Sequence, residues 1–143
     1  MEVRDFIDQI EQQRKEQDAV YHSAAVRYGL SDSAMWIIYL VSDDGASYTQ
    51  QALCRECCLA KQTINTAINQ LMRNEYVYLE TIPGTRNEKR VLLTQKGQAL
   101  AAKTTDQLKA AELRVYEQFT VEERNQYLEL TARITGYLKA ELS

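Results

Sequence analysis

Residues 59–97 constrain the fold of this chain more than any other stretch. Residues 59–73, LAKQTINTAINQLMR, form an amphipathic helical pattern with apolar positions at i, i+3, i+4 and i+7. Two runs rich in aromatic and β-branched residues follow, 76–82 and 90–93, and a charged Pro-Gly turn separates them. A short helix followed at once by an antiparallel hairpin predicts a helix-turn-helix with a wing.

The two faces of the 59–73 helix differ in chemistry. One face is an apolar stripe that predicts contact with a core, made of Ile64, Ala67, Ile68 and Leu71. The other face carries amides, hydroxyls and cations, the groups that read base edges and bind phosphates in a DNA major groove. Its candidate DNA contacts are Lys61, Gln62, Thr63, Asn65, Thr66, Asn69 and Arg73. A face that meets only water is the alternative interpretation.

Charge is distributed unevenly along the chain. The net charge is −3, yet residues 47–97 contain seven basic and four acidic side chains, a local charge of +3. Arg86, Lys89 and Arg90 are predicted to lie at the hairpin tip, either solvated or in contact with phosphates or the minor groove. A mildly basic centre between acidic flanks fits a module that binds a nucleic-acid groove.

Helices are predicted on both sides of this module. Gly29 is a candidate C-cap for a first helix, and Ser31 an N-cap for a second helix that reaches about residue 42. The second helix is apolar all round, which predicts burial on every side. Thr49 is a candidate cap for a third helix, and the helix after Thr94 is predicted to run towards residue 119.

The last helix is predicted from a capping-box pattern, Thr120 to Glu123, and ends near residue 142. Its apolar stripe consists of Tyr127, Leu130, Thr131, Ile134, Tyr137, Leu138 and Leu142. Such a stripe on a small domain that already has a core favours burial against a second subunit, with packing inside the monomer as the alternative.

Composition excludes several classes of protein. At 143 residues and 45% hydrophobic content the chain fits one domain with a core. No apolar run approaches 18 residues and the first residues do not resemble a signal peptide, so we expect a cytoplasmic protein without membrane contact. The sequence offers no glycine-rich phosphate loop and no histidine-anchored site, and we expect no enzyme activity, cofactor or metal.

Three segments in order carry a resemblance to a known family: residues 28–36 (YGLSDSAMW), 59–66 (LAKQTINT) and 93–97 (LTQKG). The last is similar to the Leu-Thr-x-x-Gly signature that closes the wing in the MarR family of bacterial transcriptional regulators. The resemblance implies a mainly α fold with a small β-hairpin wing (α+β), a single domain over 1–143. Dimerisation helices, 1–29 and 108–143, would flank a winged helix-turn-helix region, 31–97.

The resemblance also implies a function. The protein would be a homodimer that binds double-stranded DNA at a pseudo-palindromic operator, with half-sites on the order of 10 base pairs apart. It would repress transcription until a small aromatic effector releases it. Gln62 and Asn69 would pair with adenine edges and Thr66 would touch a thymine methyl group, while Lys61, Arg73 and the wing cations would contact phosphates.

This chain departs from the family at three places. Thr66 stands where the family commonly has an arginine, and the wing lacks the family's Asp-x-Arg pattern. Glu75 stands where a glycine commonly follows the reading helix, and Asn74 is expected to take the left-handed conformation instead.

Two further groups of side chains are candidates for sensing a signal. The effector pocket of the family would be lined here by Tyr21, His22, Tyr28, Trp36 and Tyr39, although aromatic residues at helical spacing are also typical of a core. Cys54, Cys57 and Cys58 lie on neighbouring positions of the third helix, either as redox-responsive thiols or as small buried hydrophobes. A thiol-based regulator and a winged-helix module that binds only proteins remain the alternative functions.

Overall fold

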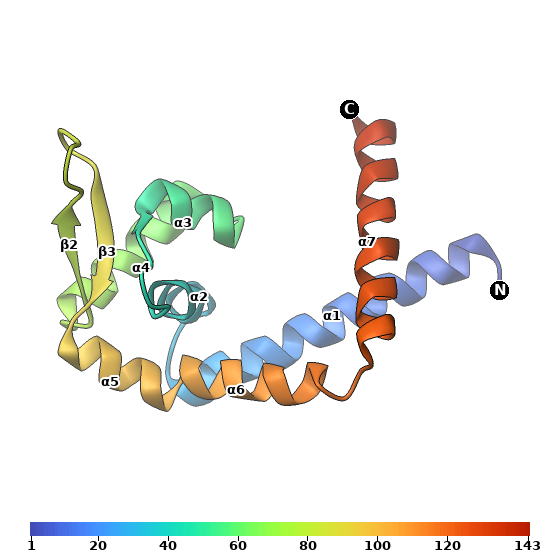
Figure 1. Ribbon diagram of the computed structural model, residues 1–143, viewed down its shortest axis with the longest axis horizontal. Helices are drawn as coiled ribbons and strands as arrows, with labels where there is room; N and C mark the ends of the chain where they lie inside the picture. The colour runs from blue at the N-terminus through green and yellow to red at the C-terminus, as the bar shows by residue number, and fades with distance from the viewer. The chain divides into compact units, whose positions relative to one another are not determined.

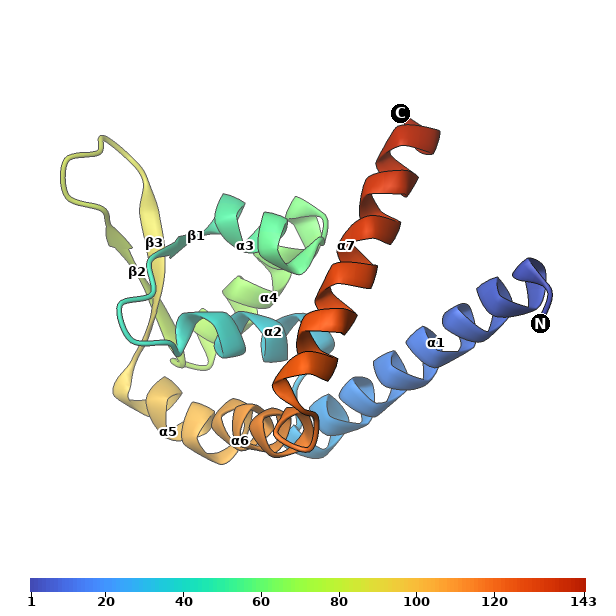
Figure 2. The same cartoon turned by 45° about the vertical axis from the view of Figure 1, so that its right-hand side comes forward.

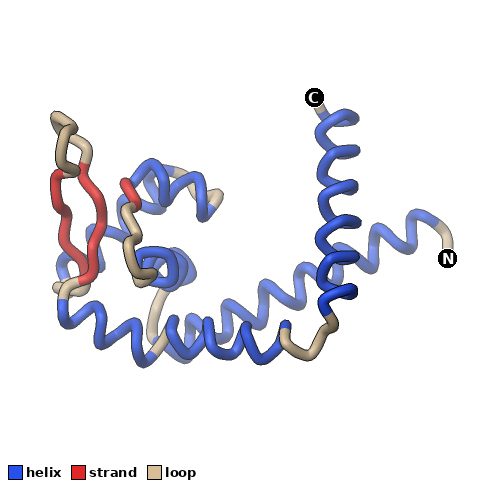
Figure 3. The backbone as a smooth tube through the Cα atoms, in the orientation of Figure 1, coloured by secondary structure: helices blue, strands red, loops and turns tan.

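The computed structural model describes residues 1–143, and Figures 1 and 3 show its helices and strands. The chain divides into two compact units, residues 1–106 and 107–143, and each is described by itself. The elements are α1 (Val3–Tyr28), α2 (Asp32–Val41), β1 (Tyr48–Thr49), α3 (Gln50–Cys57), α4 (Lys61–Arg73), β2 (Val77–Thr81), β3 (Lys89–Leu93), α5 (Gln95–Lys103), α6 (Thr105–Tyr116) and α7 (Val121–Leu142).

Hydroxyl side chains start the helices where the sequence predicts them. The hydroxyls of Ser31, Thr49 and Thr94 each accept a hydrogen bond from the backbone amide three residues later, at 3.0–3.1 Å. Thr120 and Glu123 form the predicted capping box at the start of α7. These caps confirm four predicted helix starts, because each satisfies an amide that the first helical turn leaves without a partner.

A three-stranded antiparallel sheet forms the wing, with the order β1-β3-β2. The β2–β3 hairpin agrees with the prediction and pairs Val77 with Leu93 and Thr81 with Lys89 at its two ends. β1 was not predicted. It is only two residues long, pairs Tyr48 with Val91, and leads directly into α3, so that it joins the helix-turn-helix to the wing (Figure 2).

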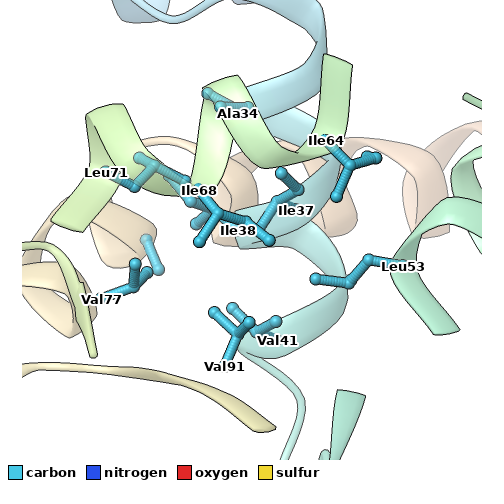
Figure 4. Packing of buried hydrophobic residues seen from close by; sticks show 12 residues of the cluster. Ala34, Ile37, Ile38, Val41, Leu53, Ile64, Ile68, Leu71, Val77 and Val91 are labelled. Carbon is cyan, nitrogen blue, oxygen red and sulfur yellow. The ribbon is translucent and has the colours of Figure 1, made fainter. Parts of the chain in front are cut away.

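The core lies between α2, α3, α4 and the sheet (Figure 4). The predicted stripe of α4 faces it completely, since Ile64, Ala67, Ile68 and Leu71 are all buried. Their partners include Ile37, Ile38, Val41, Leu53, Val77 and Val91. Burial of this stripe leaves the polar face of α4 as the side turned to solvent.

The prediction that α2 is buried on every side is wrong. Met35, Ile37 and Ile38 are fully buried, but Trp36 and Tyr39 are only half-buried. The Trp36 ring lies between Tyr21 of α1 and Tyr39, on a face of α2 that its neighbours cover only in part. The apolar composition of α2 predicted burial, but it could not show how much of the helix surface other elements would cover.

Three helices end in a residue with the left-handed conformation, and only the first of these is glycine. Gly29, Cys58 and Glu75 have φ values of 71°, 53° and 63°. The Asn74 prediction is therefore wrong: its φ is −86°, and Glu75 takes the left-handed position. The reason is hydrogen bonding, because the amides of Glu75 and Tyr76 reach the carbonyls of Met72 and Leu71 only with that geometry.

The predicted long helix after Thr94 is interrupted at Thr104, which separates α5 from α6 with φ −126° and ψ −89°. Its hydroxyl donates to the carbonyl of Leu100 at 2.8 Å and its amide donates to Ala101 at 3.2 Å. The amide of Thr104 thus bonds three residues back instead of four, so the regular α-helical hydrogen bonding is broken at this residue.

The second unit, residues 107–143, consists of most of α6 and all of α7. None of the 22 residues of α7 is buried, although its stripe includes Ile134 and Leu138. None of the helices combines the length and the apolar composition that crossing a membrane requires.

Candidate nucleic-acid interface

The polar face of α4 is open to solvent as predicted. The seven candidate contacts are all exposed: Lys61, Gln62, Thr63, Asn65, Thr66, Asn69 and Arg73. They alternate with the buried stripe, so the core holds the helix while the opposite side remains available. A rigid helix presenting amides, hydroxyls and cations along one face has the size and chemistry of a major-groove reading helix.

The first turn of α4 has no side-chain cap. Ala60 occupies the N-cap position, and no side chain accepts a hydrogen bond from the backbone amides that follow it. Backbone amides at a helix start carry partial positive charge and bind anions such as DNA phosphates. Lys61 and Gln62 lie at this end, so charge and hydrogen-bond donors coincide there.

Thr66 uses its hydroxyl within the helix. The Oγ1 atom donates a hydrogen bond to the carbonyl of Gln62 at 2.9 Å. A hydroxyl engaged with its own backbone is less available to a base edge, whereas the methyl group keeps its apolar character. The geometry is thus compatible with a thymine methyl contact and less so with hydrogen-bonded readout at this position.

The wing tip is a closed loop over residues 82–88. The amide of Ile82 donates to the carbonyl of Glu88 at 2.8 Å, and the Thr85 hydroxyl donates back to Ile82 at 2.7 Å. Gly84, with φ 82°, permits the tight turn. Arg86 lies exposed in this loop, as predicted.

The predicted placement of the other two wing cations is wrong. Lys89 is the first residue of β3, and Arg90 lies inside that strand rather than at the tip. Arg90 is directly opposite Glu80 on β2 and forms an ion pair with it. Its side chain is half-buried, and the Nε atom is buried without a hydrogen-bond partner. Arg90 therefore braces the hairpin by a cross-strand pair in this structure.

Glu80 was missed by the sequence analysis, although a signal for it exists. In an antiparallel hairpin, residues at equal distances from the turn face each other, and Glu80 and Arg90 lie symmetrically about Thr85. The pair also supplies a cross-strand brace in a wing that lacks the Asp-x-Arg pattern.

The five aromatic and histidine candidates do not form one site. Three rings make a cluster between α1 and α2: Trp36 lies 5.2 Å from Tyr21 and 5.3 Å from Tyr39, centroid to centroid. His22 instead pairs through Nδ1 with the carboxylate of Asp32 at 2.9 Å. Tyr28 lines a separate hollow of about 200 Å³ beside the end of α4. Tilted and edge-on rings at these distances stabilise packing between helices, so the cluster has a structural role of its own.

The cysteines differ in their surroundings. Cys54 and Cys57 are half-buried and pack against the core, while Cys58 is exposed at the end of α3. Burial raises the pKa of the Cys57 thiol, and the neighbouring Cys54, Cys58 and Glu56 raise it further. A raised pKa disfavours the reactive thiolate, so Cys57 lacks the electropositive environment of a redox-sensing cysteine.

The combination of helix-turn-helix, exposed polar face and braced wing defines a winged helix-turn-helix protein. A MarR family regulator from Neisseria meningitidis matches it with a TM-score of 0.77 at 19% identity, covering 96% of this chain and 98% of that one. A putative MarR family regulator from Listeria monocytogenes complexed with a 26mer DNA matches with a TM-score of 0.71 at 15% identity, covering 94% and 89%. NadR in complex with 4-hydroxyphenylacetate gives 0.71 at 16% identity, covering 87% and 88%.

No protein-family profile and no curated protein matches the sequence. The likeness is therefore one of structure. The chain has the fold of MarR family regulators, and this confirms both the predicted fold class and the resemblance carried by residues 28–36, 59–66 and 93–97.

Proposed function

We propose that this protein is a transcriptional regulator of the MarR type that binds double-stranded DNA through α4 and the wing. The observation that carries the proposal is the exposed polar face of α4 directly opposite a fully buried stripe, next to a hairpin with an exposed cation at its tip. One protein with this fold is seen complexed with DNA, which supports DNA as the ligand of this chain.

The seven candidate contacts on α4 have proposed roles in base readout or in phosphate binding. Gln62 and Asn69 pair with adenine edges and Thr66 contacts a thymine methyl group, which favours an A·T-rich operator. Lys61 and Arg73 contact phosphates, together with Arg86 and Lys89 of the wing. Thr63 and Asn65 lie at the edges of the reading face and support the phosphate contacts, while Arg90 acts through the shape of the wing.

We propose that the protein binds DNA as a homodimer formed by residues 1–29 and 108–143. The terminal helices expose apolar side chains that a monomer leaves in water: Phe6, Ile7 and Ile10 on α1, and Leu130, Ile134 and Leu138 on α7. A second copy is the simplest partner, since most oligomers of soluble proteins are symmetric dimers. Two reading helices in successive major grooves then require a pseudo-palindrome with half-sites about 10 base pairs apart.

The proposed mode of regulation is repression relieved by a small aromatic ligand in the cytoplasm. Support for the ligand class comes from the fold, which in NadR is seen with 4-hydroxyphenylacetate. In this chain the rings nearest to one another are Tyr21, Trp36 and Tyr39, and these are the first residues to examine for ligand contact.

The test is selection of bound duplexes from a random pool, followed by titration of the selected duplex and a scrambled one at several salt concentrations. We expect two chains per duplex, a pseudo-palindromic consensus, and affinity that falls as salt rises. Asn69→Ala should change the preferred sequence, whereas Lys89→Ala should weaken binding to both duplexes and lower the salt slope by about 0.9.

Two outcomes would refute the proposal in different ways. Equal effects of Asn69→Ala and Lys89→Ala on all sequences would show that the roles are assigned wrongly. No sequence preference at any salt concentration would remove the DNA-binding function and favour a module that binds protein partners.

A further inference from the structure

The start of α5 is hydrogen-bonded to the two residues that follow the end of the reading helix α4. The amide of Thr94 donates to the carbonyl of Tyr76 at 3.0 Å, and its hydroxyl donates to the carbonyl of Glu75 at 2.6 Å. Gly97 approaches Tyr76 so closely that a Cβ atom would lie 1.9 Å from the Tyr76 oxygen. The end of α4 and the start of α5 are thus held in one fixed relation.

Lys96 adds a side-chain cation to this junction. Its Nζ atom donates to the carbonyl of Asn74 at 2.8 Å and lies 4.8 Å from the centroid of the Tyr76 ring. Asn74 is the C-cap of α4, so the ammonium group meets a helix end with partial negative charge and an aromatic face at once. In the sequence, Lys96 is one of the seven basic side chains of residues 47–97.

The contacts of Lys96 distinguish it from the proposed phosphate-binding cations. The side chains of Lys61, Arg86 and Lys89 are exposed and form no hydrogen bond or ion pair in the structure. Lys96 instead directs its charge at the C-terminal end of α4. Base contacts in helix-turn-helix proteins come mainly from the opposite, N-terminal part of the reading helix.

Because α4 is long, a small change of angle at its C-terminal end displaces its N-terminal end considerably. Thirteen residues of α4 span about 20 Å. A tilt of about 5° at the fastened end would move the far end by about 1.7 Å, which is more than a base-edge hydrogen bond tolerates. Loss of one such contact costs a factor of about ten in discrimination between sequences.

We propose that Lys96 is a positioning residue that sets the orientation of the reading helix, and that it does not bind DNA phosphate. The proposal rests on the DNA-binding function proposed above. It assigns sequence specificity in part to a side chain outside α4, on the element that leads from the wing towards the second unit.

Three variants of the 143-residue protein test the proposal. Lys96→Met keeps the length of the stem and removes the charge and donor, while Lys96→Arg keeps a cation that can reach the Asn74 carbonyl and stack on Tyr76. Lys103→Met is the matched control, because it makes the same chemical change at an exposed position of the same helix. Binding to the selected and the scrambled duplex is measured by fluorescence anisotropy over a range of salt concentrations.

We expect Lys96→Met to lower the ratio of specific to nonspecific affinity about tenfold. The salt slope of Lys96→Met should equal that of Lys103→Met. Lys96→Arg should retain most of the ratio. A salt slope lower than that of Lys103→Met by about 0.9 would show a direct phosphate contact and overturn the proposal. An unchanged ratio in Lys96→Met would overturn it as well. Absence of specificity in the wild type would instead refute the proposed function itself.

Discussion

Replacing Gly97 by alanine should destabilise the protein strongly, although the residue lies in a helix where alanine is normally preferred. Helix propensity alone would favour the change by about 1 kcal/mol. The contact decides the sign instead, because the new Cβ atom would lie 1.9 Å from the Tyr76 oxygen, where real Cβ contacts essentially never fall below 3.0 Å. The structure must open by roughly 1.1 Å at this point.

The cost follows from what surrounds the contact. The neighbouring atom belongs to the backbone, so it cannot rotate away as a flexible side chain would, and overpacking costs up to about 3 kcal/mol. Opening the junction also weakens the Thr94 cap of α5, worth about 1 kcal/mol. After the gain in helix propensity, the net loss is about 3 kcal/mol, or a decrease in Tm of about 10 °C for a chain of this size.

Thermal and urea denaturation of Gly97→Ala measure this loss, with Gln98→Ala as the control at the next, exposed position of the same helix. The control should unfold close to the wild type. A Gly97→Ala variant with an unchanged or higher Tm would show that α5 does not pack against Tyr76 this closely, and the argument from steric contact would fail.

Further changes test other features. Glu75→Gly should stabilise the protein by about 1 kcal/mol in denaturant titrations, because glycine adopts the left-handed conformation without the cost that a Cβ atom adds; a loss of stability would contradict this. Timed alkylation with mass spectrometry should modify the exposed Cys58 before Cys57, whose raised pKa suppresses the thiolate at neutral pH, and the reverse order would be inconsistent with the burial described. The hydrogen bond from the Thr120 amide lowers the pKa of Glu123, so the carboxylate stabilises α7 above its unfolded-state pKa, and this contribution is lost as pH falls through the lowered value. Circular dichroism on acidification should therefore show a loss of helicity that is smaller in Glu123→Gln, which keeps the acceptor; identical acid profiles would refute the role of the charge.

The sequence by itself determined the features that depend on neighbouring residues. The apolar stripe of α4 and its polar opposite face follow from helical periodicity, which holds wherever the helix is placed. The N-caps Ser31, Thr49 and Thr94 follow from hydroxyls that reach an amide three residues away. Strand composition around a Pro-Gly turn predicted the β2–β3 hairpin for the same reason.

Only the tertiary structure decided the features that join distant segments. Arginine is a side chain typical of DNA contacts, but the strand register places Arg90 opposite Glu80. Lys96 reads as one more surface cation until the end of α4 lies within 2.8 Å of it. The half-burial of Trp36 likewise depends on how much of α2 another helix covers.

The physical reason is the range of the interactions. Helix caps and amphipathic stripes are settled within one or two turns of the chain, whereas cross-strand pairs, close backbone approaches and partial burial depend on how segments far apart in sequence come together. Glu75 shows the limit most directly. Its side chain disfavours the left-handed conformation, and the hydrogen bonds that link the end of α4 to the start of β2 impose that conformation nevertheless.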